Sequence, residues 1–202
     1  DLPNKSSDEL KQSAHAIEQQ GNNLLALINQ LLDISKIKSK MGNFDWRNGN
    51  ITTYVSMLVD TYRNYACSKN IDLQLFVKEP VTMDFVPDYI NKVFNNLLSN
   101  AFKFTPEHGK ITVSMWREDS NLLIEVSDTG EGMDKETANN VFNPFYQGVT
   151  DSMNIGTGIG LALVKQVIDS LNGKINVRSR EGYGTTFHIE IPIINECNVK
   201  LN

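Results

Sequence analysis

Cysteine is scarce in this sequence, which has only Cys67 and Cys197 among its 202 residues. Two cysteines so far apart cannot form a disulfide framework or a four-ligand zinc site, and such sparse use fits a reducing compartment. Long apolar runs are also lacking, so no segment has the length of a membrane span. The opening DLPNKSS is not a signal peptide. We therefore expect a cytoplasmic chain with no membrane contact by this segment.

An excess of positive charge is missing as well. The chain has 19 Lys and Arg against 24 Asp and Glu, a formal net charge of −5. A nucleic-acid binder needs clustered basic residues for its phosphate contacts, so this balance predicts no nucleic-acid partner. A nucleotide with a bound metal is still compatible with it. With 40% hydrophobic residues the composition is that of a globular protein large enough for a sizeable core.

The first segment has the spacing of a bundle helix. Its apolar positions alternate steps of four and three, interrupted only by a glycine, and Leu25 and Leu32 widen the stripe: Leu10, Ala14, Ile17, Gly21, Leu24, Ile28 and Leu31. We expect this helix to pack in a multi-helix bundle with partners from outside the chain or from a second copy. The alternative is a helix folded back on the main domain. The periodicity ends in KSKMGNFDWRNGN, which places a domain boundary near Gly42.

The remaining sequence predicts an α/β domain over residues 43–195, with a first segment at 1–42 and a tail at 196–202. Because the chain begins with Asp1 and not Met, we expect it to be an excerpt of a longer protein. Strand and helix patterns follow one another and end in a hairpin whose turn contains Gly182 and Gly184. The expected elements are a strand near 44–46, a helix at 51–67, strands at 71–77 and 82–85, a helix from Pro87, strands at 109–117 and 122–128, helices near Asp134 and up to Leu171, and the hairpin over 173–193. The expected sheet is mixed and largely antiparallel.

The helix in DYINKVFNNLLSNAFKF has a polar face beside its apolar stripe. Asn96, Asn100 and Lys103 fall at i, i+4 and i+7, so they share this face. A carboxamide oxygen suits a hard cation such as Mg²⁺, and an ammonium one turn away suits a phosphate. The alternative for such a row is an ordinary solvated helix face.

A carboxylate ends an apolar row in NLLIEVSDTGEGM. Strand alternation puts Leu122, Ile124, Val126 and Asp128 on one face. A buried carboxylate needs a donor, which an amino group such as that of adenine would supply. The glycines Gly130 and Gly132 would let the backbone pass close to such a ligand. The alternative is a turn in which Asp128 caps the helix near Asp134.

Three glycines precede a helix in NIGTGIGLALVK, at 156, 158 and 160. A helix N-terminus offers free N–H groups and a partial positive charge, and glycines allow a phosphate to come close to them. The alternative is a flexible loop before a helix. The polar stretch from Gln147 to Ile155 is typical of a mobile lid. Before it, Phe142 and Phe145 are spaced as core anchors.

Five motifs in one order carry a family resemblance: Asn100 with Lys103, DTGEGM, the pair Phe142 and Phe145, GTGIGL, and GYGTTF. They resemble the N, G1, F, G2 and G3 boxes of the sensor histidine kinases, in the superfamily of gyrase B, the Hsp90 chaperones and MutL. The similarity spans about residues 10–192. It implies a two-layer α/β (α+β) sandwich of the Bergerat type with a mixed sheet, preceded by the second helix of the dimerisation and phosphotransfer bundle.

The resemblance also implies roles for particular residues. Asn100 would bind Mg²⁺, Lys103 would contact phosphate, Asp128 would accept a hydrogen bond from the adenine amine, and Thr185 would support that contact. Asn100 and Lys103 would be the catalytic residues. The full set implied to bind the cofactors ATP and Mg²⁺ is Asn96, Asn100, Lys103, Asp128, Gly130, Gly132, Gly156, Thr157, Gly158, Gly160, Leu161 and Thr185.

Some positions depart from the family pattern. Many members have Arg in the F box, where this chain has Pro144. Asn96 stands where hydrolysing relatives place a Glu that activates water, and a carboxamide cannot accept that proton. None of His15, His108 and His188 matches the phosphoacceptor motif H-[ED]-x-x-P, so the acceptor histidine is expected upstream of this chain.

The implied function is the catalytic, ATP-binding part of a histidine kinase that phosphorylates a histidine of its homodimer and passes the phosphoryl group to a response regulator receiver domain. The parent protein could be anchored in the inner membrane. The alternative is a nucleotide-sensing pseudokinase in which ATP binding only sets the conformation. Asp128-Thr129-Gly130 matches the short motif of the aspartic proteases. Those proteins are almost all β, and the periodic helices of this sequence exclude that class. A P-loop enzyme lacks its motif, and a Rossmann site would place the glycines straight after a strand.

Overall fold

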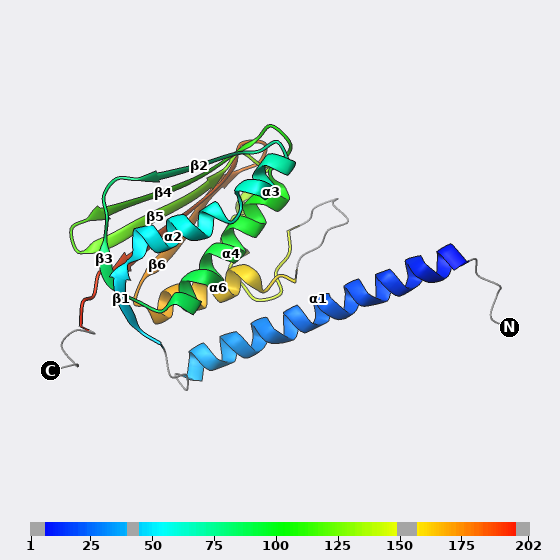
Figure 1. Cartoon of the computed structure of the whole chain (residues 1–202), viewed down its shortest axis with the longest axis horizontal. Helices are drawn as coiled ribbons and strands as arrows, with labels where there is room; N and C mark the ends of the chain where they lie inside the picture. The colour runs from blue at the N-terminus through cyan, green and yellow to red at the C-terminus, as the bar shows by residue number, and fades with distance from the viewer. Residues whose placement is uncertain (1–6, 40–44, 149–156, 197–202) are drawn as a thin grey trace.

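The computed structural model describes residues 7–39, 45–148 and 157–196, apart from the side chains of residues 7–9 and of Asn23. It has two layers and a long N-terminal helix, α1 (Ser7–Ser39), that extends beyond them (Figure 1). One layer is a five-stranded sheet in the order β2-β4-β5-β7-β6. Only the β2–β4 pair is parallel. The strands are β2 (Asp72–Val77), β4 (Lys110–Glu118), β5 (Asn121–Asp128), β7 (Gly184–Pro192) and β6 (Lys174–Arg180).

Helices cover one face of this sheet. The layer is formed by α2 (Ile51–Asp60), α4 (Pro87–Phe104) and α6 (Gly160–Ser170), with the short α3 (Arg63–Ser68) following α2. A further short helix, α5 (Lys135–Asn140), contacts β6. A small antiparallel pair, β1 (Arg47–Asn50) with β3 (Thr82–Phe85), lies outside the main sheet. The predicted α/β sandwich with a mixed, largely antiparallel sheet and an N-terminal helix is therefore confirmed.

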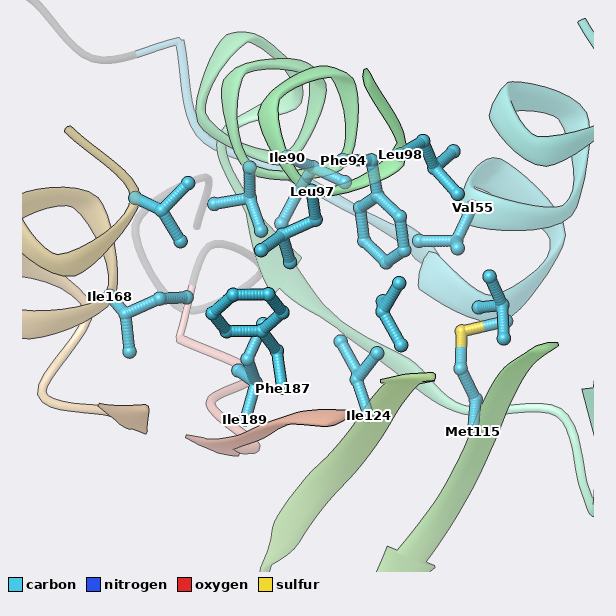
Figure 2. Close-up of a cluster of buried hydrophobic side chains, with 14 of the residues drawn as sticks. Val55, Ile90, Phe94, Leu97, Leu98, Met115, Ile124, Ile168, Phe187 and Ile189 are labelled. Atoms are coloured by element: carbon cyan, nitrogen blue, oxygen red, sulfur yellow. The ribbon is translucent and has the colours of Figure 1, made fainter. Parts of the chain in front are cut away.

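The core lies between α4 and the sheet. Phe94 and Leu97 of α4 are fully buried, and they point toward Ile124 of β5 and Phe187 of β7 (Figure 2). Val55 of α2 and Ile168 of α6 close the two sides. Burial of an apolar side chain of this size is worth about 1.5–3 kcal/mol, so this cluster fixes α4 firmly over the sheet.

The long helix α1 buries little of its apolar stripe. The seam residues Leu10, Ile17, Leu24, Ile28 and Leu31 are exposed, Leu24 by 59%. Only the last turns contact the two-layer domain, where Ile37 is buried and α1 packs beside α6. The alternative of a helix folded back along the domain therefore holds only for this C-terminal end. Among the described helices, none combines the length and hydropathy that a bilayer crossing requires.

Most predicted elements are confirmed within two residues, but the helix expected at 51–67 is broken. It divides into α2 and α3, because Thr61 and Tyr62 donate their N–H groups to carbonyls three residues back. Tyr62 then stacks on Phe102 with ring centroids 5.6 Å apart. No glycine or proline marks this break, which coincides with a tertiary contact. The first strand also starts later than expected, at Arg47.

One core prediction is wrong. Phe142 does pack against the core, edge-on to Phe187 at 6.2 Å. Phe145 is 60% exposed, because its backbone takes a φ of +66° and donates its N–H to the carbonyl of Gly158. The left-handed backbone turns this side chain away from the sheet. The predicted boundary near Gly42 lies outside the described residues, so the division into 1–42, 43–195 and 196–202 stays a prediction.

Candidate functional site

A cleft of about 410 Å³ opens between α4, the start of α6 and the ends of β5 and β7. Among the residues predicted from sequence, those that line it are Asn96, Asn100, Lys103, Asp128, Gly132, Thr157, Gly158, Gly160, Leu161 and Thr185. Gly130 does not line it, and Gly156 lies outside the described residues. Segments that are far apart in the sequence therefore meet in one cleft.

Asp128 is the last residue of β5 and is buried, with 9% of its surface exposed. Its Oδ1 accepts hydrogen bonds from the backbone N–H groups of Gly130, at 2.9 Å, and Thr185, at 3.2 Å. Burial raises the pKa of this carboxyl, and the two backbone donors oppose the shift. Since both donors share Oδ1, the other carboxylate oxygen has no hydrogen-bond partner among the described residues.

The alternative in which Asp128 caps the following helix is wrong. The cap of α5 is Asp134, whose carboxylate accepts from the N–H of Thr137 at 2.7 Å. Gly130 belongs to the Asp128 turn, although it does not line the cleft. A Cβ at Gly130 would lie 2.5 Å from the carbonyl oxygen of Phe104, so only glycine lets this turn approach the end of α4.

The polar face of α4 forms a second wall of the cleft. Asn96 donates from Nδ2 to the carbonyl of Lys92 at 2.7 Å, which holds its side chain along the helix. Asn100 has no side-chain hydrogen bond to any described residue and is half-buried at the cleft. The Lys103 ammonium lies 4.9 Å from the ring centroid of Phe104, and burial lowers its pKa. No described carboxylate pairs with Lys103, so it brings a positive charge to the cleft.

The third wall is the N-terminus of α6. Its N-cap residue, Ile159, supplies no side-chain cap, while Thr157 Oγ1 accepts from the N–H of Ile159 at 3.3 Å. Gly158 has a φ of +68°. A Cβ on Gly160 would clash with Asn96, so glycine allows the start of α6 to lie directly against α4. The predicted helix N-terminus beside the glycines is therefore present, and it faces the polar row of α4.

Sequence reasoning missed several lining residues. Gln30 comes from α1, and its place beside the predicted seam gave no signal for its contact with Thr157, 127 residues away in the sequence. Met133 is the last residue of the DTGEGM motif, and Thr137 and Val141 follow it, so proximity to this motif was the available signal. The remaining missed residues are Ser99, Phe104, Glu131, Tyr146, Gln147, Gly148 and Phe187.

None of the three histidines lines the cleft. His15 is exposed on α1, 3.9 Å from Glu18. His108 occupies an exposed turn with a φ of +64°. His188 lies on the other face of the sheet from Phe187, with Nδ1 3.1 Å from Glu125. Within the described ranges there is also no cluster of three His, Cys, Asp or Glu side chains that could hold a metal ion.

Comparison with known proteins agrees with this geometry. Residues 86–195 match the family model described as histidine kinase-, DNA gyrase B- and HSP90-like ATPase. The autoinducer 2 sensor kinase/phosphatase LuxQ of Vibrio parahaemolyticus is 31% identical over 93% of this chain and 23% of its own length. The circadian input-output histidine kinase CikA of Synechococcus elongatus is 34% identical over 88% of this chain and 24% of its own. The chain thus spans about a quarter of these relatives.

Solved structures show the same fold. The catalytic domain of histidine kinase ThkA superposes with a TM-score of 0.67 at 25% identity, covering 75% of this chain and 99% of that domain. Full-length ShkA in complex with AMPPNP gives a TM-score of 0.79 at 24% identity, over 94% of this chain and 40% of that one.

The chain therefore belongs to the histidine kinase-, DNA gyrase B- and HSP90-like ATPase family. Within this family, it carries the catalytic ATP-binding domain of a sensor histidine kinase.

Proposed function

We propose that the cleft binds Mg·ATP and presents its γ-phosphate to a histidine outside this chain, carried by the dimer that α1 helps to form. The phosphoryl group would then pass to an aspartate on a response regulator receiver domain. One observation carries this proposal: a buried carboxylate with an uncommitted oxygen, Asp128, shares a cleft with an unneutralised ammonium, Lys103. These two groups match the two ends of a nucleotide, an amine donor and a phosphate anion.

Asp128 would hold the adenine. Its free oxygen would accept a hydrogen bond from the exocyclic amine, while Gly130 and Thr185 keep the carboxylate in place through Oδ1. A hydrogen bond to a charged group is worth about 1.5–3 kcal/mol, so this contact would make a large part of the selectivity for adenine. Thr185 also lines the cleft and would support the base directly.

The phosphates would lie between Lys103, Asn100 and the start of α6. The N-terminus of α6 attracts an anion, because its first N–H groups carry a partial positive charge. Gly158 and Gly160, with Thr157 and Leu161, line this end, and Gly156 is included in the proposal from its sequence position. Gly132 and Asn96 complete the proposed set.

Asn100 fits a magnesium ligand. Its carboxamide is half-buried at the cleft with no side-chain hydrogen bond to a described residue. A site with a single protein oxygen suits Mg²⁺, which keeps several waters and binds largely through substrate phosphates. When bound, Mg²⁺ supplies charge neutralisation for the phosphates and so favours phosphoryl transfer. Asn100 would orient the ion, and Lys103 would stabilise charge on the transferred group.

The choice of acceptor also follows from the cleft. Asn96 occupies the cleft wall with a carboxamide, which cannot accept a proton from water, so water should be a poor acceptor. A neutral imidazole is a suitable nucleophile, and an adjacent carboxylate would take up its proton. Since His15, His108 and His188 all lie away from the cleft, the acceptor would come from another segment.

The experiment measures binding and transfer separately. Calorimetry with Mg²⁺ and a non-hydrolysable ATP analogue should show binding by the chain, and Asp128→Ala should weaken it by about tenfold or more. Asp72→Asn, a change at an exposed strand residue, serves as the control. With γ-³²P-labelled ATP the chain should label itself negligibly, while a protein that also contains the preceding bundle helix should form acid-labile phosphohistidine. Equal affinity of wild type and Asp128→Ala would refute the site, and a longer protein that binds ATP without labelling would favour the pseudokinase.

A further inference from the structure

The long helix α1 contributes a side chain to the nucleotide cleft. Gln30 lines the cleft together with Thr157 and Asn96. The Thr157 hydroxyl donates a hydrogen bond to Gln30 Oε1 at 2.9 Å. Thr157 belongs to the segment of glycines that leads into α6, and the same hydroxyl accepts from the N–H of Ile159. The bundle helix is therefore bonded directly to the segment proposed to enclose the phosphates.

A second contact lies one turn further along α1. Asp33 forms an ion pair with Lys92 of α4 at 3.2 Å, and both side chains are about three-quarters buried. Burial lowers the pKa of Lys92, but its hydrogen bonds to Asp88 and Asp33 outweigh this and raise the pKa overall. Ile37, a further turn on, is buried. These residues, Gln30, Asp33 and Ile37, form one edge of α1, which we call the docking edge.

The docking edge and the exposed seam lie on different sides of α1. Leu24, Ile28 and Leu31 stay exposed while the docking edge contacts the domain. The helix can therefore use its seam for a bundle partner and its docking edge for the nucleotide domain. A polar contact such as Gln30–Thr157 suits a reversible function, because its net stabilisation is small and water can replace it.

We propose that Gln30 couples α1 to the nucleotide cleft, because it competes with the phosphates of a bound nucleotide for Thr157. In the absence of nucleotide, Gln30 holds the Thr157 hydroxyl and keeps α1 docked. A phosphate at the start of α6 replaces Gln30 as the partner of Thr157. Gln30 is then released, and the contacts of the docking edge with the domain weaken. This inference rests on the proposed function, since it requires phosphates at the α6 N-terminus.

The coupling has a predictable size and is reciprocal. A neutral hydrogen bond contributes about 0.5–1.5 kcal/mol net, which corresponds to an affinity change of about twofold to tenfold. Linkage requires that, if docking weakens nucleotide binding by such a factor, nucleotide binding weakens docking by the same factor. The bundle could thus sense the nucleotide state through a side chain of its own.

The test uses the complete 202-residue chain, Mg²⁺ and a non-hydrolysable ATP analogue. Gln30→Met keeps the length of the side chain but removes its hydrogen-bond acceptor. By calorimetry this variant should bind the analogue about twofold to tenfold more tightly than wild type. Asp33→Asn should change the affinity in the same direction. Gln20→Met, at an exposed position of the same helix, is the matched control and should bind as wild type does.

Amide hydrogen exchange supplies a second measurement. In the wild type, exchange at residues 33–39 should become faster when the analogue binds, and in Gln30→Met this increase should shrink. Weaker or unchanged binding by Gln30→Met overturns the inference, because weaker binding would mean that Gln30 supports the nucleotide directly. Binding by the wild type together with either of those results leaves the proposed function standing. Absence of any binding by the wild type removes both.

Discussion

Two amphipathic helices of this chain, α1 and α4, have similar patterns and opposite surroundings. The apolar residues of α4 are buried over the sheet, with Phe94, Leu97 and Leu98 fully inaccessible. The corresponding stripe of α1 is exposed from Leu10 to Leu32, except where its last turns reach α6. Periodicity states which face of a helix needs a partner, but it does not say whether the same chain provides that partner.

The polar faces differ in the same way. On α4, Asn96, Asn100 and Lys103 are half-buried against a cleft, because the packing of the apolar face sets the polar face beside α6 and β5. On α1, most polar residues are solvated, and Gln30 and Asp33 are distinguished by their contacts with the domain. The buried helix thus lines the cleft with its polar face, while the exposed helix contacts the domain through residues near its C-terminal end.

The largest expected effect concerns the buried helix, α4. Phe94→Ala should lower the free energy of unfolding by about 3–5 kcal/mol, because it removes a fully buried ring and leaves a cavity between α4 and the sheet. Leu24→Ala, on the exposed stripe of α1, should change the unfolding of the two-layer domain by no more than about 0.5 kcal/mol. Urea titration followed by tryptophan fluorescence would measure both. Similar losses in the two variants would show that the helices are equally integrated.

The next prediction concerns the exposed apolar stripe of α1. If the stripe of α1 is covered in a homodimer, the double change Leu24→Ala and Leu31→Ala should raise the dimer dissociation constant by at least about 30-fold, the lower limit for truncating one buried leucine. Gln12→Ala, at an exposed polar position of the same helix, should leave it unchanged. Sedimentation of wild type and variants over a concentration series gives the constants. A wild type that stays monomeric would mean that this segment of α1 does not dimerise alone.

A third prediction tests the polar face of α4. Asn100→Ala should remove most of the magnesium dependence of nucleotide affinity, a loss of about tenfold for one charge-assisted contact. Asn95→Ala lies on the same helix, where Asn95 accepts a hydrogen bond from Tyr62 at 3.1 Å, and it should keep the dependence. Calorimetry with and without Mg²⁺ separates the two variants. An Asn100→Ala variant whose affinity still responds fully to Mg²⁺ would exclude the proposed ligand.

The sequence predicts α4 well because one segment encodes both of its faces. The apolar stripe and the Asn96, Asn100 and Lys103 row are fixed by a single helical period, and the structure places all three in the cleft. Strand alternation likewise predicts the burial of Asp128. Local periodicity is sufficient wherever an element packs as a regular helix or strand.

The sequence fails where long-range contacts decide the geometry. The break between α2 and α3 coincides with the stacking of Tyr62 on Phe102, and the exposure of Phe145 goes with its left-handed backbone beside Gly158. Gln30 enters the cleft only because the end of α1 docks beside α6. No periodic pattern contains these contacts, since each joins segments distant in the sequence or a non-repeating backbone angle. The lid predicted at residues 147–155 lies mainly outside the described residues and stays a prediction.

The smallest expected effect is a pH dependence of the affinity for the ATP analogue, which arises at Asp128 at the end of β5. Because burial raises the pKa of Asp128 above its ordinary value of 3.8, the carboxylate is protonated at a higher pH than an exposed aspartate. The adenine amine needs the ionised form as its acceptor, so affinity for the ATP analogue should fall a few-fold as the pH drops through the raised pKa. The contribution of Asp128 to the stability of the nucleotide-free protein changes in the opposite direction over this pH range. The folded state holds the proton more tightly than the unfolded state, so this group favours folding more as the pH falls from the raised pKa toward 3.8.

Measurement of this effect requires a reference, since the phosphates of the analogue also titrate. Asp128→Asn provides it, because the amide has no charge to lose and the phosphate titration is common to both proteins. The ratio of wild-type to Asp128→Asn affinity, measured by calorimetry from about pH 8 down to the lowest pH at which both proteins stay folded, should decrease toward low pH. A ratio that stays constant over this whole range would mean that Asp128 keeps its charge throughout, and that the backbone donors at Gly130 and Thr185 offset its burial.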